Sequence, residues 1–173
     1  MPYLLRKIRR SKWFATLDWL SPNELQADAL GDIRTQNNEL SVWLVSDDKT
    51  NLAEVVAALS LSADQVSIVE YALIGLDIVL EKGFEVAENL GQTPFTAANH
   101  WHRDLVKLSV GKVFELCELV RQAQKERCRD REALNYMAQA LGSGAVDISK
   151  ISGKLQQSLT KKGVLHNPPA VAR

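Results

Sequence analysis

Long apolar runs are missing from this chain of 173 residues. No stretch approaches the roughly 18 uncharged apolar residues that a membrane-spanning helix needs, and no apolar run of signal-peptide length follows the basic residues near the start. We therefore expect a cytoplasmic protein without a membrane partner. The hydrophobic content of 46% and the charged content of 24% are typical of a globular domain with a sizeable core.

Cysteine is scarce, since the chain contains only Cys117 and Cys128. On one continuous helix their Cα atoms would be roughly 16 Å apart, which is too far for a disulfide. Both are therefore expected to be free thiols, with Cys117 in the core.

Sequence signatures of catalysis are also missing. The chain has no Walker loop, no glycine-rich dinucleotide fingerprint, no Gly-x-Ser-x-Gly elbow, no Cys-x-x-Cys pair and no His-Glu-x-x-His motif. An enzyme would then lack a recognisable nucleophile, and no cofactor is expected. Catalysis is the less favoured function on these grounds.

Histidine occurs only three times, and His100 and His102 bracket Trp101. Side chains two residues apart on a helix point about 200° apart, so the two imidazoles cannot share a metal ion there. His100 and Asp104 are four residues apart and can meet. We therefore predict a surface histidine paired with a carboxylate, and no metal site.

The strongest pattern that is present covers residues 93–125. Apolar residues recur there at helical spacing over more than a narrow seam. Thr93 and Pro94 supply a cap and a first-turn proline. The pattern predicts one long, mostly buried helix with Val113 and Leu116 in the core. Residues 126–132 either continue this helix or restart it with Asp130 as a cap, and the glycines from Gly142 end it.

Shorter patterns flank this segment. Residues 29–35 and 40–45 are predicted to form a β-hairpin, because the asparagines between them tolerate the positive φ of a hairpin turn. Helices are predicted over residues 52–59, over 66–80 behind a capping box with a stop at Gly83, and over 148–159. A short strand is predicted near residues 3–8, and a loop over 85–92.

These elements predict an α+β fold that is mostly helical. A small N-terminal β-hairpin or sheet is followed by a bundle of four or five helices around the long helix. We expect a single domain over residues 1–163, with a sheet-containing part at 1–46 and a helical part at 47–163. Residues 164–173, which include two prolines, are expected to form a flexible tail.

Charge is balanced overall but divided along the chain: residues 1–20 are basic, 21–100 acidic and 101–173 basic. The first block contains five cations flanked by Tyr3 and Trp13, which are Arg6, Lys7, Arg9, Arg10 and Lys12. Cations neutralise phosphate and aromatic rings stack on bases, so a nucleic-acid-binding module is one alternative function. Alternatively, these cations could lie on an edge strand, where positive charge prevents edge-to-edge aggregation.

Two groups of carboxylates are also candidates. Asp47 and Asp48 lie between a predicted strand and a predicted helix, where a metal-dependent hydrolase often places its acids. Turn formation and the helix dipole explain them equally simply. Glu24, Asp28 and Asp32 form a second acidic group, which we expect to be solvated because no histidine or cysteine accompanies it.

The function that we infer from these features is binding. We expect a non-catalytic protein-interaction protein: a subunit, an adaptor or a regulatory partner, including a toxin-neutralising one, in a larger bacterial-type assembly. Its partner would be another protein, in a heteromeric or homo-oligomeric complex. The predicted interaction patch is at the start of the long helix and comprises His100, Trp101 and Arg103, since tryptophan and arginine are enriched at hot spots. Core burial of Trp101 is the alternative.

Overall fold

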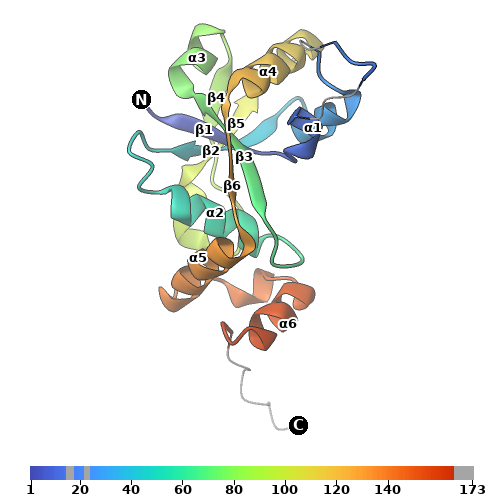
Figure 1. Ribbon diagram of the computed structural model, residues 1–173. Helices are drawn as coiled ribbons and strands as arrows, with labels where there is room; N and C mark the ends of the chain where they lie inside the picture. The colour runs from blue at the N-terminus through green and yellow to red at the C-terminus, as the bar shows by residue number, and fades with distance from the viewer. Residues whose placement is uncertain (15–17, 22–23, 166–173) are drawn as a thin grey trace. The chain divides into compact units, whose positions relative to one another are not determined.

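The computed structural model describes residues 1–14, 18–21 and 24–165, and its central element is a six-stranded sheet (Figure 1). The strand order is β4-β5-β2-β1-β3-β6, and the four pairs β4–β5, β5–β2, β2–β1 and β1–β3 are antiparallel. The strands are β1 (Tyr3–Lys7), β2 (Leu40–Val45), β3 (Val69–Gly75), β4 (Glu85–Glu88), β5 (His102–Val106) and β6 (Gln124–Cys128).

Helices connect the strands, and further helices come after the last strand, β6. The α-helices are α1 (Ser11–Phe14), α2 (Leu52–Leu61), α3 (Leu76–Glu81), α4 (Val110–Gln122), α5 (Asp130–Gly142) and α6 (Gly153–Lys161). The 3-10 helices are η1 (Ala27–Ile33), η2 (Thr96–Trp101) and η3 (Ile148–Lys150). No helix in the described part of the chain is long and apolar enough to span a bilayer.

The predicted arrangement of a small N-terminal sheet and a helical bundle is wrong, although the class remains α+β. The predicted strand near the N-terminus is present as β1, but it lies inside the sheet between β2 and β3. Leu4 and Leu5 point to opposite faces and are both fully buried. A strand that is apolar on both faces is typical of a sheet interior, so the N-terminal basic residues do not belong to an edge strand.

The predicted long helix over residues 93–125 is also wrong, because this segment forms η2, β5 and then α4. Lys107 has a φ of 55°, a left-handed conformation that no helix continues through. Ser109 then caps α4 by accepting a hydrogen bond from the amide of Lys112 at 3.3 Å. The pairing of β5 with both β2 and β4 outweighs the helical spacing of its apolar residues.

The helix predicted over residues 66–80 is replaced by β3 and the short helix α3. Ser62 donates its hydroxyl to the carbonyl of Ala58 at 2.8 Å, at the end of α2, and does not open a new helix. The predicted stop at Gly83 is confirmed, since Gly83 has a φ of 70° and Phe84 donates its amide to the carbonyl of Val79 at 3.2 Å.

The predicted hairpin is right in its turn and wrong in its first strand. Asn37 and Asn38 have φ values of 54° and 60°, as a two-residue hairpin turn requires. Residues 27–33 form η1 instead of a strand, and Ala29 and Ile33 of this helix are buried in the core. Only residues 40–45 pair within the sheet, as β2.

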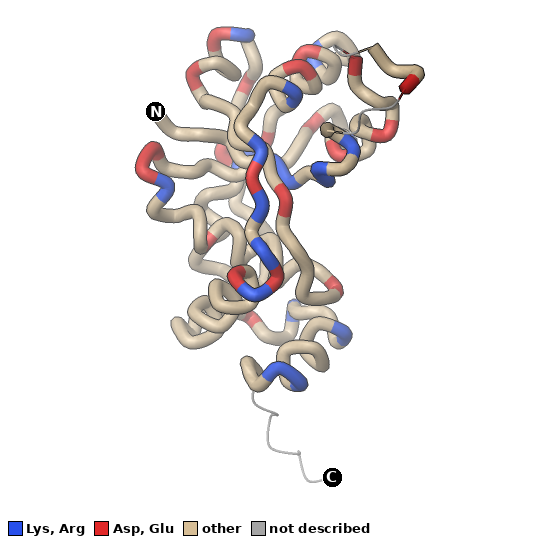
Figure 2. The backbone as a smooth tube through the Cα atoms, viewed as in Figure 1, with Lys and Arg blue, Asp and Glu red and all other residues tan. Residues whose placement is uncertain are grey.

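A new helix starts after α4, which was one of the two predicted possibilities, but Arg129 and not Asp130 is at the cap position. Residues 124–128 form the edge strand β6, and α5 begins at Asp130. Basic and acidic residues alternate along β6 (Figure 2). Charged side chains on an edge strand oppose edge-to-edge aggregation, so this dense mixed-charge run suits its position.

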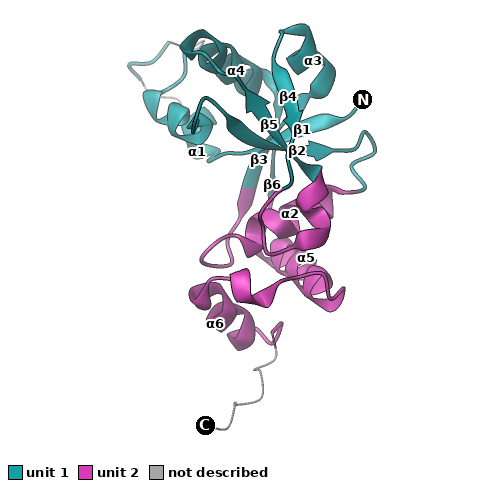
Figure 3. Cartoon of the chain, turned by 180° about the vertical axis from the view of Figure 1, so that it is seen from behind, with its two compact units in different colours: residues 1–50, 70–90, 101–127 teal, residues 51–69, 91–100, 128–173 magenta. Residues whose placement is uncertain are grey.

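The chain divides into two compact units (Figure 3). Unit 1 comprises residues 1–50, 70–90 and 101–127, and unit 2 comprises residues 51–69, 91–100 and 128–173. Unit 1 contains most of the sheet with α1, α3, α4 and η1, and Leu4, Val42, Ile74 and Leu116 are in its core. In unit 2, α2 packs against α5. The single domain predicted over residues 1–163 stays a prediction, as does the tail, most of which is outside the described residues.

Candidate binding sites

Helix α4 presents an apolar surface on its outer side. Its inner side is in the core of unit 1, where Leu116 is 1% and Val120 0% exposed. On the outer side Val110 is 73% and Phe114 58% exposed, one helical turn apart. Two large exposed apolar side chains on one turn of a helix are a candidate contact surface.

A groove between α4 and η1 adjoins this surface. Its volume is about 230 Å³, and it is lined by Leu25, Gln26, Ala27, Ala29, Leu30, Phe114, Cys117 and Glu118. Both sides of the groove belong to unit 1. Leu30 on η1 is 41% exposed and faces the same opening as Phe114. The lining is therefore mostly apolar, and the large side chains at its mouth are accessible.

Acidic residues belong to both walls of this groove. Glu118 lines it and accepts a hydrogen bond from Nε of Arg121 at 2.8 Å. On the opposite wall, Glu24 precedes the lining residues in the sequence and Asp28 lies between Ala27 and Ala29, and both carboxylates are exposed. The Asp28 carboxylate forms no ion pair with any described residue. The rim of the η1–α4 groove is therefore acidic.

Both thiols are buried and free, as predicted. Burial, followed by the charge of Glu118, raises the pKa of Cys117 to about 11. Burial and Glu132 raise the pKa of Cys128 to about 12. A protonated thiol is a poor nucleophile, so the raised pKa lowers the reactivity of Cys117, which contributes apolar surface to the groove.

The predicted nucleic-acid residues near the N-terminus are divided by the fold. Arg6 donates from Nε to the carbonyl of Asp32 at 2.8 Å and from Nη1 to the carbonyl of Ser41 at 2.7 Å. Burial lowers its pKa despite the nearby Asp32 carboxylate. Lys12 donates to the carbonyl of Asp28 and lies 3.8 Å from the Asp32 carboxylate. These two cations therefore serve the packing of η1 against β1 and α1.

The other three predicted cations remain accessible to different degrees. Lys7 and Arg9 are exposed, and Arg10 is half-buried. Lys7 is nevertheless partly desolvated by the surrounding protein, and this desolvation, followed by the charges of Arg9 and Arg6, lowers its pKa. The nucleic-acid hypothesis therefore rests on fewer residues than the sequence pattern contains.

The acidic group predicted to be solvated contains one structural carboxylate. Asp32 accepts hydrogen bonds from the amide of Arg9 at 2.7 Å and from Nε1 of Trp13 at 2.9 Å. It ties the segment after β1 to η1. Glu24 and Asp28 are exposed, as expected.

Asp47 and Asp48 lie in the exposed turn after β2. Asp47 contacts the α-amino group of Met1. Hydrogen bonds from the Ser46 side chain and from the amide and hydroxyl of Thr50 lower the pKa of Asp48. No group of three or more metal-ligating side chains forms within the described residues. The structure thus brings no third ligand to this pair there.

The predicted patch of His100, Trp101 and Arg103 lies on η2 and β5, and the unit boundary falls between the first two residues. His100 is exposed, and its Nδ1 lies 2.6 Å from the carbonyl of Ala97. Trp101 is half-buried, and Arg103 lies 3.3 Å from the Glu88 carboxylate. The interaction patch stays a prediction, but the long helix on which it was predicted to lie is not present.

A buried polar cluster on β5 has no counterpart in the sequence predictions. Asp104 is 5% exposed and accepts hydrogen bonds from Ser41 at 3.1 Å and from Asn89 at 2.9 Å. Nε2 of His102 lies 3.8 Å from the same carboxylate. Alternation along a strand places residues 102 and 104 on one face, so Asp104 lies near His102 and not near His100 as predicted. The donors make this a structural cluster that joins β2, the residue after β4, and β5.

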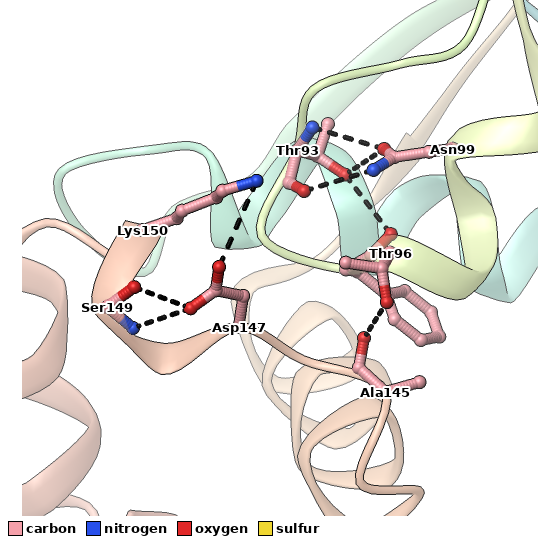
Figure 4. A network of polar contacts seen from close by, with 8 residues as sticks. Thr93, Thr96, Asn99, Ala145, Asp147, Ser149 and Lys150 are labelled. Carbon is pink, nitrogen blue, oxygen red and sulfur yellow. Dashed lines mark hydrogen bonds and ion pairs between the residues drawn. The ribbon is translucent and has the colours of Figure 1, made fainter.

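Polar contacts in unit 2 hold two of its loops together (Figure 4). Thr93 donates its amide and hydroxyl to the Asn99 side chain at 3.1 and 2.7 Å, and so does not cap a helix. Thr96 donates its hydroxyl to the carbonyl of Ala145 at 2.8 Å, and Asp147 caps η3. Every one of these donors has a protein acceptor, which is typical of a structural network.

Comparisons of the chain with protein-family models, with curated proteins and with solved structures find no match. Function must therefore be argued from the surfaces themselves. Among these surfaces, the η1–α4 groove combines exposed apolar side chains, a concave lining and exposed carboxylates on both walls.

Proposed function

We propose that this protein is a non-catalytic binding protein that holds a basic amphipathic segment of a partner protein in the η1–α4 groove. The observation that carries the proposal is the acidic rim around an exposed apolar surface. The groove, at about 230 Å³, is smaller than the roughly 300 Å³ at which small-molecule sites begin. It fits one anchoring side chain of a larger partner better than a metabolite.

Charge complementarity selects the partner's chemistry. Asp28 and Glu24 are exposed on one wall, and Glu118 is on the other. Lysine or arginine residues of the partner would face these carboxylates, which raises the association rate and disfavours acidic competitors. Amphipathic helices commonly bind such grooves through apolar anchors one turn apart.

Phe114 is the proposed hot spot. It lines the groove and is 58% exposed, so a partner can bury the remaining ring surface. Aromatic anchors in the centre of an interface carry a large share of its binding free energy. A subunit, an adaptor or a regulatory partner such as a toxin-neutralising protein uses surfaces of this kind, and we place its action in the cytoplasm.

Selection from a displayed library of random peptides tests the proposal on the full chain. We expect enriched peptides that carry lysine or arginine and two apolar residues at helical spacing. Phe114→Ala should weaken the binding of a fluorescein-labelled enriched peptide by about thirtyfold. Leu80→Ala is the matched control, because Leu80 is 52% exposed on another helix of the same unit.

The acidic rim is tested separately. Asp28→Asn should weaken peptide binding and reduce its dependence on salt, whereas Glu39→Gln, at an exposed carboxylate away from the groove lining, should do neither. Enrichment of acidic or uncharged peptides would contradict the proposed partner. Equal losses in Phe114→Ala and Leu80→Ala would remove the groove from the binding site.

A further inference from the structure

A second surface of unit 1 surrounds the exposed ring of Phe14. Phe14 ends α1 and is 53% exposed. The guanidinium carbon of Arg10 lies 4.9 Å from the centroid of the ring, and Nζ of Lys125 lies 5.1 Å from it. The fold thus brings a cation from the N-terminal basic block and a cation from β6 to one accessible aromatic ring.

No described carboxylate pairs with the side chain of either cation. Among the described residues, neither Arg10 nor Lys125 forms an ion pair with a carboxylate. Glu70 is engaged by the backbone amide of Arg10 at 2.9 Å, and Lys125 donates to the carbonyls of Arg121 and Ala123. An anion bound here would therefore meet two cations that no described carboxylate pairs with.

Electrostatic repulsion between neighbouring cations also favours anion binding at this site. Burial, then the charges of Arg121 and Arg10, lower the pKa of Lys125. Arg121 also pairs with Glu118 at 2.8 Å, which compensates part of its charge. Like charges held close together favour the binding of an anion, because the anion offsets their mutual repulsion.

We propose that Arg10, Phe14 and Lys125 form a binding site for single-stranded nucleic acid. The cations would contact backbone phosphate, and the exposed ring would stack on a base. Bases in a duplex are already stacked and paired and cannot stack on the ring. The site should therefore bind a single strand more tightly than a duplex. This site is separate from the η1–α4 groove, and the inference does not rest on the proposed peptide binding.

Fluorescence anisotropy with labelled 12-nucleotide oligothymidine and oligouridine tests the inference on the full chain. We expect binding at low salt that weakens as salt rises, with a log–log slope of about −1.4 for the two phosphate contacts of Arg10 and Lys125. Phe14→Leu keeps an apolar side chain and removes the aromatic ring, so it should weaken binding about fivefold or more. Lys125→Gln should reduce the salt slope by about 0.7.

Matched variants separate this site from general surface effects. Phe114→Leu replaces an equally exposed phenylalanine outside the cluster, and Lys107→Gln replaces an exposed lysine that pairs with Glu85. Both should bind the oligonucleotides as the parent does. Circular dichroism confirms that each variant is folded. A groove variant that loses peptide binding and retains oligonucleotide binding shows that the two proposals are independent.

Three results would overturn the inference. No oligonucleotide binding at low salt removes the site. Equal binding by the parent and by Phe14→Leu, with displacement by heparin, identifies a polyanion site without base stacking. A polyglutamate peptide that binds as tightly as the oligonucleotides and loses affinity in Phe14→Leu identifies an acidic protein as the ligand.

Discussion

Replacing Leu116 and Phe114 in turn with alanine should separate stability from binding on one helix. Leu116 is 1% exposed in the core of unit 1, so Leu116→Ala loses the burial of its side chain and leaves a cavity, at about 2 to 5 kcal/mol. Phe114 is 58% exposed. Full burial of such a side chain contributes roughly 1.5 to 3 kcal/mol, and less than half of the Phe114 surface is buried. Phe114→Ala should therefore lower the free energy of unfolding by about 1 kcal/mol. The core substitution should lower the free energy of unfolding at least twice as much.

Urea denaturation followed by tryptophan fluorescence measures this difference within one unit. All four tryptophans of the chain belong to unit 1, so their emission reports that unit, whereas far-ultraviolet circular dichroism reports both. The slope with urea should stay constant if the substitutions change stability and not compactness. A Leu116→Ala protein that unfolds at the parental midpoint, or a Phe114→Ala protein that is the less stable of the two, would show that the faces of α4 are assigned wrongly.

Three further predictions concern other parts of the chain. Asp104→Ala removes the buried carboxylate that accepts hydrogen bonds from Ser41 and Asn89. It should lower the free energy of unfolding by about 2 to 5 kcal/mol in urea denaturation. An unchanged urea midpoint would mean that the cluster is solvated. Cys117 and Cys128 should resist a thiol reagent at pH 8 until urea unfolds the protein. Because their pKa values rise from 9.0 to about 11 and 12, the unfolded state loses their protons first, so stability should fall as pH rises above about 9; fast native labelling would contradict both statements. Trp101→Ala should lower the melting temperature if Trp101 is a core residue and lower only partner affinity if it is an interface residue, which calorimetry and binding of the same variant distinguish.

Local signals in the sequence predicted several elements correctly. The helix near residues 52–59 is present as α2, and the glycine stop at Gly83 and the asparagine turn at residues 37–38 have the expected positive φ values. The last helix is present as η3 and α6. Each of these features depends on hydrogen bonds between residues a few positions apart, which the sequence displays directly.

Strand pairing was the part that the sequence did not display. Apolar residues spaced by three and four over residues 101–110 are compatible with a helix, and only the pairing of β5 with β2 and β4 makes residues 102–106 a strand. Residues 124–128 carry so many charges that no strand pattern is apparent, yet β6 needs only one paired side as the edge of the sheet. Tertiary pairing thus overrides local preference in both segments.

The candidate sites depend on the same pairing. Phe14 and Phe114 are both apolar in the sequence, and no periodicity shows that each is more than half exposed. The position of β6 in the sheet brings Lys125 to the ring of Phe14, over a separation of more than a hundred residues in the chain. The packing of η1 on α4 likewise places Leu30 opposite Phe114. Sequence reasoning identified the basic block and the acidic block, and the fold decides which members of each block remain available to a partner.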